Sequence, residues 1–261
     1  MSDWLRSVFA KIQRADELIR ELDAHLSGVD PRTVHVVHVS RNSHNGEDSL
    51  GFRINPPPEP ELLQVRVGEV LYQLRSCLDH LVGALERVNG LDRDSEYEFP
   101  VFWDAGKFKA GAQRKIKGVS ASAAARIEGL QPYQRKGFHS YRNHPLWILH
   151  DLGNTDKHRV LISITNSMQV NSVAVGVTIR GGRPAIVFPG KEMRWSLTVP
   201  VEHRADPNSV PPQMKMPIDI SLLVAFSQFG NDTNQPIIPC LQQLRDFVFQ
   251  LVESFRPEFP T

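Results

Sequence analysis

The longest apolar stripe of the chain lies in residues 60–88 and constrains the fold more than any other feature. Hydrophobic side chains recur there at three- and four-residue spacing, at Val67, Val70, Leu71, Leu74, Cys77, Leu78, Leu81, Val82, Leu85 and Val88. This period is typical of one α-helix, and Asn89-Gly90 is a common helix end. Because the apolar positions cover a broad side of that helix, we predict that it is central and that other elements pack around it.

Four further helices are predicted from apolar periodicity and end signals. They cover residues 3–24, 121–131, 145–154 and 239–255. Ser120 or Ser122 can cap the second of these, and Pro145 suits the first turn of the third. The first and last helices are both amphipathic, so we expect them to pack with residues 60–88 into a bundle.

Two regions have the composition and period of β-strands. Residues 33–55 predict a hairpin, because two β-branched runs flank the turn signal Asn45-Gly46. After Arg159 the period changes, and strands are predicted at 159–166, 172–180, 183–190, 193–200 and 217–229. A run of strands that does not alternate with helices favours the α+β class, here with a mostly antiparallel sheet of about five strands.

These elements predict one α+β domain over residues 1–261. Residues 1–158 form its mainly helical part, which includes the hairpin 33–55. Residues 159–229 form the sheet, and residues 237–256 form a C-terminal helix that packs back onto the bundle.

Composition narrows the classes of function. The 30 basic and 29 acidic side chains give a net charge of +1, which argues against a large nucleic-acid surface. One basic cluster stands out, and it fits either a solvated loop or a phosphate-contacting patch: Lys107, Lys109, Arg114, Lys115 and Lys117. Cys77 and Cys240 lie on apolar helix patterns, where a thiol is a small buried hydrophobe, so a thiolate metal site is not expected.

The N-terminal residues and the hydropathy of the chain predict its location. Residues 1–26 alternate charges with hydrophobic residues, unlike a signal peptide, and no apolar run approaches the length of a membrane span. We therefore expect a cytoplasmic protein with no membrane partner, and no motif in the chain calls for a cofactor.

The sequence RSCLDH, residues 75–80, places an arginine and a histidine near the margins of the central apolar stripe. One interpretation is structural: Arg75 pairs with Asp79 one turn later, and His80 fills a polar margin beside Ser76. The other is chemical. Histidine titrates near neutral pH and can act as acid or base, whereas the planar fork of arginine binds phosphate oxygens.

An arginine, a polar residue, three more residues and a histidine on a bundle helix resemble the motif of the HEPN superfamily. Many members are metal-independent ribonucleases of toxin, defence and RNA-processing systems, with active sites formed across a dimer, and others are non-catalytic binding modules. The resemblance covers the helices and makes the strands a large insertion. It implies a homodimer that cleaves or binds RNA, with Arg75 on the scissile phosphate and His80 as the acid or base.

The stretch HPLWILHDLGNTDKHR, residues 144–159, allows three interpretations. Its polar residues can tie together a turn after a helix that ends near Asn154. His144, His150, Asp151 and His158 offer metal ligands, although at unfamiliar spacing. Alternatively, its polar and cationic end joins Ser76 of the central helix to bind an anion, through Asn154, Lys157, His158 and Arg159.

Three functions follow from these patterns. The preferred hypothesis is a HEPN-like protein of a bacterial toxin or defence type that cleaves or binds RNA without a metal ion. The first alternative is a non-catalytic module that binds a protein partner. The second is a metal-dependent hydrolase built on His144, His150 and His158.

Overall fold

The structure is a computed structural model of the whole chain. It describes residues 3–27, 34–41, 48–54, 59–91, 97–137, 140–158, 162, 164–173, 178–180, 193–198, 218–230, 232 and 235–260. The helical elements in chain order are η1 (Asp3–Leu5), α1 (Arg6–Ser27), α2 (Pro60–Val88), α3 (Ala105–Lys115), α4 (Ala121–Gly129), η3 (Pro132–Gln134), η4 (Ser140–Asn143), α5 (Pro145–His158), α6 (Ile237–Ser254) and η6 (Arg256–Glu258).

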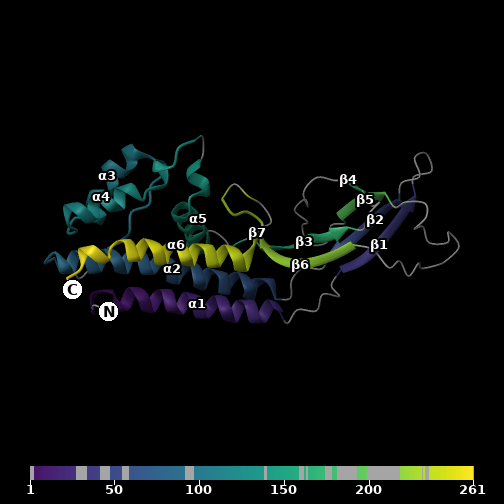
Figure 1. Cartoon of the computed structure of the whole chain (residues 1–261), viewed down its shortest axis with the longest axis horizontal. Helices are drawn as coiled ribbons and strands as arrows, with labels where there is room; N and C mark the ends of the chain where they lie inside the picture. The colour runs from purple at the N-terminus through teal and green to yellow at the C-terminus, as the bar shows by residue number, and fades with distance from the viewer. Residues whose placement is uncertain are drawn as a thin grey trace.

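The three long helices form the bundle predicted from the sequence (Figure 1). α1, α2 and α6 lie side by side, and α3, α4 and α5 lie on the side of the bundle away from α1. The bounds predicted for α2 are confirmed at both ends, since its apolar period runs unbroken between Pro60 and Val88. The two chain ends lie at the same end of the bundle, away from the strands.

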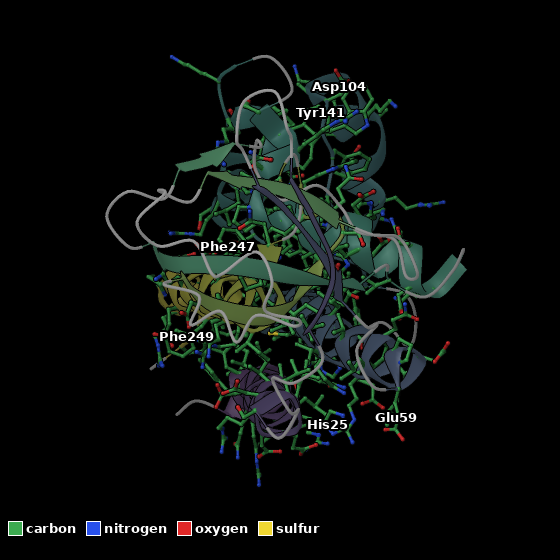
Figure 2. The ribbon with its side chains drawn as sticks, turned by 90° about the vertical axis from the view of Figure 1, so that its right-hand side faces the viewer. His25, Glu59, Asp104, Tyr141, Phe247 and Phe249 are labelled. Carbon is green, nitrogen blue, oxygen red and sulfur yellow. The ribbon has the colours of Figure 1, made fainter. Side chains whose placement is uncertain are left out.

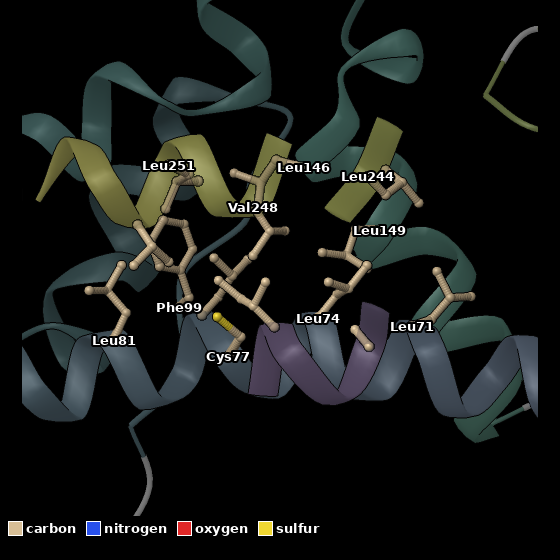
Figure 3. Close-up of a cluster of buried hydrophobic side chains, with 14 of the residues drawn as sticks. Leu71, Leu74, Cys77, Leu81, Phe99, Leu146, Leu149, Leu244, Val248 and Leu251 are labelled. Carbon is tan, nitrogen blue, oxygen red and sulfur yellow. The ribbon is translucent and has the colours of Figure 1, made fainter. Parts of the chain in front are cut away.

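The core lies where α2, α5 and α6 meet, and one side chain comes from outside the helices (Figure 3). Leu74 of α2 lies toward Leu149 of α5, and Phe99 lies at the Leu81 end of the cluster, beside Val248 of α6. All five are at most 1% exposed. Burying a large apolar side chain contributes roughly 1.5–3 kcal/mol, so this cluster fixes α5 and the neighbourhood of Phe99 against α2. Both cysteines are buried, as predicted.

The described strands support the α+β class but do not form one five-stranded sheet. They are β1 (Val34–Arg41), β2 (Asp48–Ile54), β3 (Ile164–Val173), β4 (Thr178–Arg180), β5 (Met193–Thr198), β6 (Ile218–Phe226) and β7 (Gln235–Pro236). They pair as two antiparallel sheets, in the orders β1-β2-β5-β4 and β3-β6-β7. The hairpin β1-β2 is therefore part of a sheet. The strand predicted at 183–190 lies outside the described residues.

Two predictions for the helical part were wrong. The basic cluster that begins at Lys107 was expected in a loop, but most of it lies on α3, which Asp104 caps by accepting a hydrogen bond from the Lys107 amide at 2.9 Å. α5 was expected to end near Asn154, but it continues to His158. Ser120 is the cap of α4, where its hydroxyl accepts from the Ala123 amide.

Candidate functional site

The RSCLDH segment is divided between two sides of α2. Successive residues on a helix are 100° apart, so residues four apart share a side. Arg75 and Asp79 face the irregular segment 97–102, whereas Ser76 and His80 lie on the side that is partly open to solvent. The chemistry of this segment therefore has to be considered for each side separately.

Arg75 and Asp79 together hold the backbone of Phe99. Nη2 of Arg75 donates to the Phe99 carbonyl at 2.6 Å, and Oδ1 of Asp79 accepts from the Phe99 amide at 2.8 Å. The same Arg75 nitrogen lies 3.6 Å from Asp79 Oδ1. We call these three residues the Phe99 clamp. It is supported by Gln131, which is buried and accepts a hydrogen bond from Phe102 while donating to Pro100.

Glu98 and Lys115 extend the clamp into a charge network. Glu98 Oε1 lies 3.3 Å from Arg75 Nη2, and Glu98 Oε2 accepts from Lys115 Nζ at 2.6 Å. Burial alone would raise the pKa of Glu98, but Lys115 and Arg75 hold it below its usual range. Burial likewise raises the pKa of Asp79, against the opposing effects of Arg75 and the Phe99 amide.

The structure thus places Arg75 and His80 on different sides of α2. The Arg75 side chain is only 8% exposed and is engaged by Phe99, Asp79 and Glu98. A phosphate group cannot reach it without opening the clamp. Among the described residues, Arg75 therefore has a structural position in the Phe99 clamp and does not lie beside His80 on one open surface.

His80 is half-buried and lies toward α1. Burial and the nearby cation Lys11 lower the pKa of its imidazole, and Asp79 opposes this shift. The ordinary pKa of histidine is already below neutral, so His80 is mainly uncharged at pH 7. An uncharged imidazole at a partly open position can accept a proton from a bound ligand.

Two lysines approach one exposed ring on the same side of α2. Tyr72 is 51% exposed, and its ring centroid lies 5.6 Å from Lys11 Nζ of α1 and 5.7 Å from Lys157 Nζ of α5. Tyr72, Ser76 and His80 are spaced four residues apart, so they follow one stripe along α2. We call the surface made by Lys11, Tyr72, Ser76, His80 and Lys157 the α2 face.

A hollow of about 510 Å³ continues the α2 face toward the N-terminal end of α2. Arg14, Val65, Tyr72 and Asp156 are among its lining residues. Gly68 lets the end of α5 approach α2 here, because a Cβ atom on it would lie only 2.6 Å from the Asp156 carboxylate oxygens. This close approach brings Lys157, the next residue of α5, to the α2 face.

α5 presents three of the predicted polar residues on one side. His150, Asn154 and Lys157 are spaced four and three residues apart on a continuous helix, where the sequence had suggested a turn after Asn154. Burial and the nearby Arg75 lower the pKa of His150 to about 4. The Asn154 side-chain nitrogen lies 3.0 Å from His150 Nε2, and because an amide nitrogen donates, Nε2 is the acceptor and the ring proton is on Nδ1.

The remaining predicted residues are not all placed. Lys157 and Ser76 lie on the α2 face, and Asn154 lies beside it. The side chain of His158 and all of Arg159 fall outside the described residues. Lys11 and Tyr72 were missed, because the pairing of α1 with α2 is a tertiary property that leaves no motif in the sequence.

The histidines proposed as metal ligands have other neighbours. His144 Nδ1 accepts from the Leu146 amide, and its ring packs edge-on against Phe247 of α6. His150 is bonded to Asn154 as described above. Among the residues that the structure describes, no three or more histidine, cysteine, aspartate or glutamate side chains are grouped as they would be to hold a metal ion.

Comparison of the chain with models of protein families, with curated proteins and with solved structures finds no match. Within the described residues, no helix combines the length and the apolar character needed to cross a membrane. Evidence on function therefore comes from the α2 face and its surroundings.

Proposed function

We propose that this protein binds RNA through the α2 face. The main support is that two ammonium groups from different helices, those of Lys11 and Lys157, lie within 6 Å of the exposed ring of Tyr72. Ser76 and His80 follow Tyr72 along the same stripe of α2. Phosphate binding uses cations and hydroxyl donors, and an exposed aromatic ring offers a base a surface for stacking. In this proposal Lys11 and Lys157 take the phosphate-binding role that the HEPN resemblance implied for Arg75.

A salt titration of binding tests this proposal. The probe is a fluorescent single-stranded RNA of about 16 nucleotides, the upper end of common site sizes, with 2′-O-methyl groups so that it cannot be cut. Removing a lysine that contacts phosphate lowers the salt slope by about 0.7 for a single strand. Lys11→Ala and Lys157→Ala should each show this loss, measured by fluorescence anisotropy in EDTA.

Arg20→Ala is the matched control for these variants. Arg20 lies on α1, as Lys11 does, but it is exposed and pairs with Asp16 of the same helix. We expect its binding curve and salt slope to match those of the wild type. Equal slopes for all four proteins, or no binding by the wild type, would refute the proposal.

A second proposal, metal-independent cleavage, is favoured by the state of His80. The unprotonated imidazole can take the proton of an RNA 2′-hydroxyl while that oxygen attacks the adjacent phosphorus. The bond from phosphorus to the 5′-oxygen then breaks, and solvent protonates the leaving oxygen. The products carry a 2′,3′-cyclic phosphate and a 5′-hydroxyl, and Lys11 or Lys157 offsets the charge on the phosphate.

Unmodified RNA in EDTA distinguishes binding from cleavage. Cleavage to cyclic-phosphate ends that disappears in His80→Ala supports the second proposal, and equal cleavage by His80→Ala refutes it. Sedimentation of the same samples tests the homodimer that the HEPN resemblance implies. A monomer at assay concentration would leave binding possible but remove the active site shared between two copies.

A further inference from the structure

A row of aromatic rings leads across the surface toward the α2 face. The ring of Trp103 stacks on Tyr141 of η4 at a centroid distance of 5.7 Å and an interplanar angle of 29°. Tyr141 contacts Trp147 of α5 edge-on at 5.3 Å, and Trp147 lies 5.6 Å from His150. We call these four residues the aromatic row. Figure 2 labels Tyr141 on the opposite side of the molecule from His25 of α1.

The row continues to the α2 face along one side of α5. Trp147, His150 and Lys157 are spaced three and seven residues apart, so they lie on the same side of the helix. At a rise of 1.5 Å per residue, the ten residues from Trp147 to Lys157 span about 15 Å. Lys157 then lies over Tyr72 of α2. The rings therefore lead from Trp103 to His150, and the same side of α5 carries Lys157 two turns further on, at the α2 face.

Cations accompany the exposed end of the row. Trp103 is 41% exposed, and the Lys107 ammonium lies 4.3 Å from its ring centroid. The Arg142 guanidinium lies 6.0 Å from the ring of Tyr141. Lys109 and Arg114 are exposed on α3, a helix that contains no acidic residue. This end of the row combines aromatic surface with positive charge, which is the chemistry that recognises a strand of unpaired nucleotides.

The other end of the row is held rigidly. Trp147 is partly buried against the core, and Tyr141 is fixed between Trp147 and Trp103. Gly230 adopts φ +65°, and a Cβ atom there would lie 2.7 Å from the Arg142 carbonyl oxygen, so the chain after β6 packs closely under η4. Rigid rings lose little conformational entropy when a base stacks on them, whereas the flexible Lys107 can leave the ring for a phosphate.

We infer that the aromatic row stacks the unpaired bases of the bound strand, so that the substrate class is single-stranded RNA. This inference rests on the proposed function and specifies its substrate. A duplex keeps its bases stacked on one another and presents no free base faces to Trp103, whereas a single strand can place bases on the row and phosphates on Lys107 and Arg142. The strand then runs along α5 to Lys157.

The test compares single-stranded and hairpin RNA of the same base composition, both 2′-O-methylated, by anisotropy in EDTA. Base stacking on an aromatic side chain changes affinity by at least about fivefold. Trp103→Ala should weaken single-strand binding by at least this factor, and Trp103→Phe should restore part of the loss. Binding of the hairpin should be weaker than that of the single strand and insensitive to both substitutions.

Trp4→Ala is the matched control. Trp4 has nearly the same exposure, 38% against 41% for Trp103, but it lies at the start of the bundle in η1. We expect the RNA affinity of Trp4→Ala to equal that of the wild type. Single-stranded RNA should quench the tryptophan fluorescence of Trp4→Ala, and it should quench that of Trp103→Phe much less.

The outcomes separate this inference from the proposed function. If the wild type binds RNA and Lys157→Ala weakens binding, but Trp103→Ala has the wild-type affinity or the hairpin binds as well as the single strand, the inference is overturned and the α2 face is retained. If the wild type binds neither RNA, the proposed function fails and the inference fails with it.

Discussion

Replacing Arg75 with alanine should destabilise the protein strongly, because Arg75 closes the Phe99 clamp. The substitution leaves the buried Phe99 carbonyl without its donor, at a cost of about 1–3 kcal/mol. It also removes the positive charge beside Asp79 and Glu98. These carboxylates are 28% and 46% exposed, so solvent screens them and the added cost is below about 1 kcal/mol. The expected total loss is about 1–4 kcal/mol.

Urea unfolding followed by far-ultraviolet circular dichroism measures this loss. Arg14→Ala is a suitable control, because Arg14 is 46% exposed and its ion pairs in the described part of the chain are with glutamates of the same helix, so its loss should cost less than about 0.5 kcal/mol. Arg75→Lys keeps the charge but not the fork of donors, so its loss of stability should lie between those of Arg14→Ala and Arg75→Ala. An Arg75→Ala protein as stable as the wild type would refute the structural role of the clamp.

A double-mutant cycle tests whether the clamp acts as one unit. Arg75 and Asp79 hold the carbonyl and the amide of the same residue, Phe99, so the loss of either side chain frees the segment for both. The losses for Arg75→Ala and Asp79→Ala should therefore sum to more than the loss in the double variant, by about 0.5–3 kcal/mol. Strict additivity would show that the two contacts are independent.

Three further substitutions probe how the site is held in place. Gly68→Ala should cost about 1–3 kcal/mol in urea unfolding because its Cβ meets the Asp156 carboxylate, and Asp156→Ala in the same chain should restore most of the loss. Gly230→Ala should cost about 1–3 kcal/mol through its positive φ and its contact with the Arg142 carbonyl, whatever the residue at 156. The pKa of His150 is about 4 in the folded chain and about 6.5 when unfolded, so stability should fall by about 1.4 kcal/mol per pH unit between these values as pH decreases. His150→Gln should flatten this dependence in unfolding curves at pH 7 and pH 5, and an unchanged slope would contradict the assignment.

The helices with a regular apolar period were the part of the fold that the sequence predicted best. α2 agrees with its prediction at both ends because its core positions recur without interruption. α3 was missed because its eleven residues include two glycines and bury only Phe108 and Ala112, which is too little for a periodic signal. α5 was predicted too short, since the polar residues after Asn154 resemble a turn although they continue the helix.

The candidate site was predictable only in part. The spacing of Ser76 and His80, and that of His150 and Asn154, follows from helix geometry alone, whereas Lys157 lies beyond the helix end that the sequence predicted. The partners of Arg75 in the 97–102 segment could not be predicted from the sequence. That segment has no regular structure, and its position depends on Gln131 and on burial of Phe99. The pairing of strands into two sheets also depends on contacts between distant segments, which local patterns do not encode.

The two sides of RSCLDH have different requirements, and the helix satisfies both with one short motif. Arg75 and Asp79 need to face the segment 97–102, where charged groups form strong hydrogen bonds to the Phe99 backbone. In the proposed function Ser76 and His80 need access to the RNA, and the 100° step from Arg75 to Ser76 turns them toward the partly open side of α2. Phe99 anchors the segment whose Glu98 engages Lys115, so the clamp also fixes part of the charge around His150. Under the proposed function, substitutions at Arg75 should therefore weaken RNA binding through loss of structure, with stability and affinity falling together. Substitutions at His80 or Lys157 should change the proposed binding or cleavage while the unfolding curve stays that of the wild type.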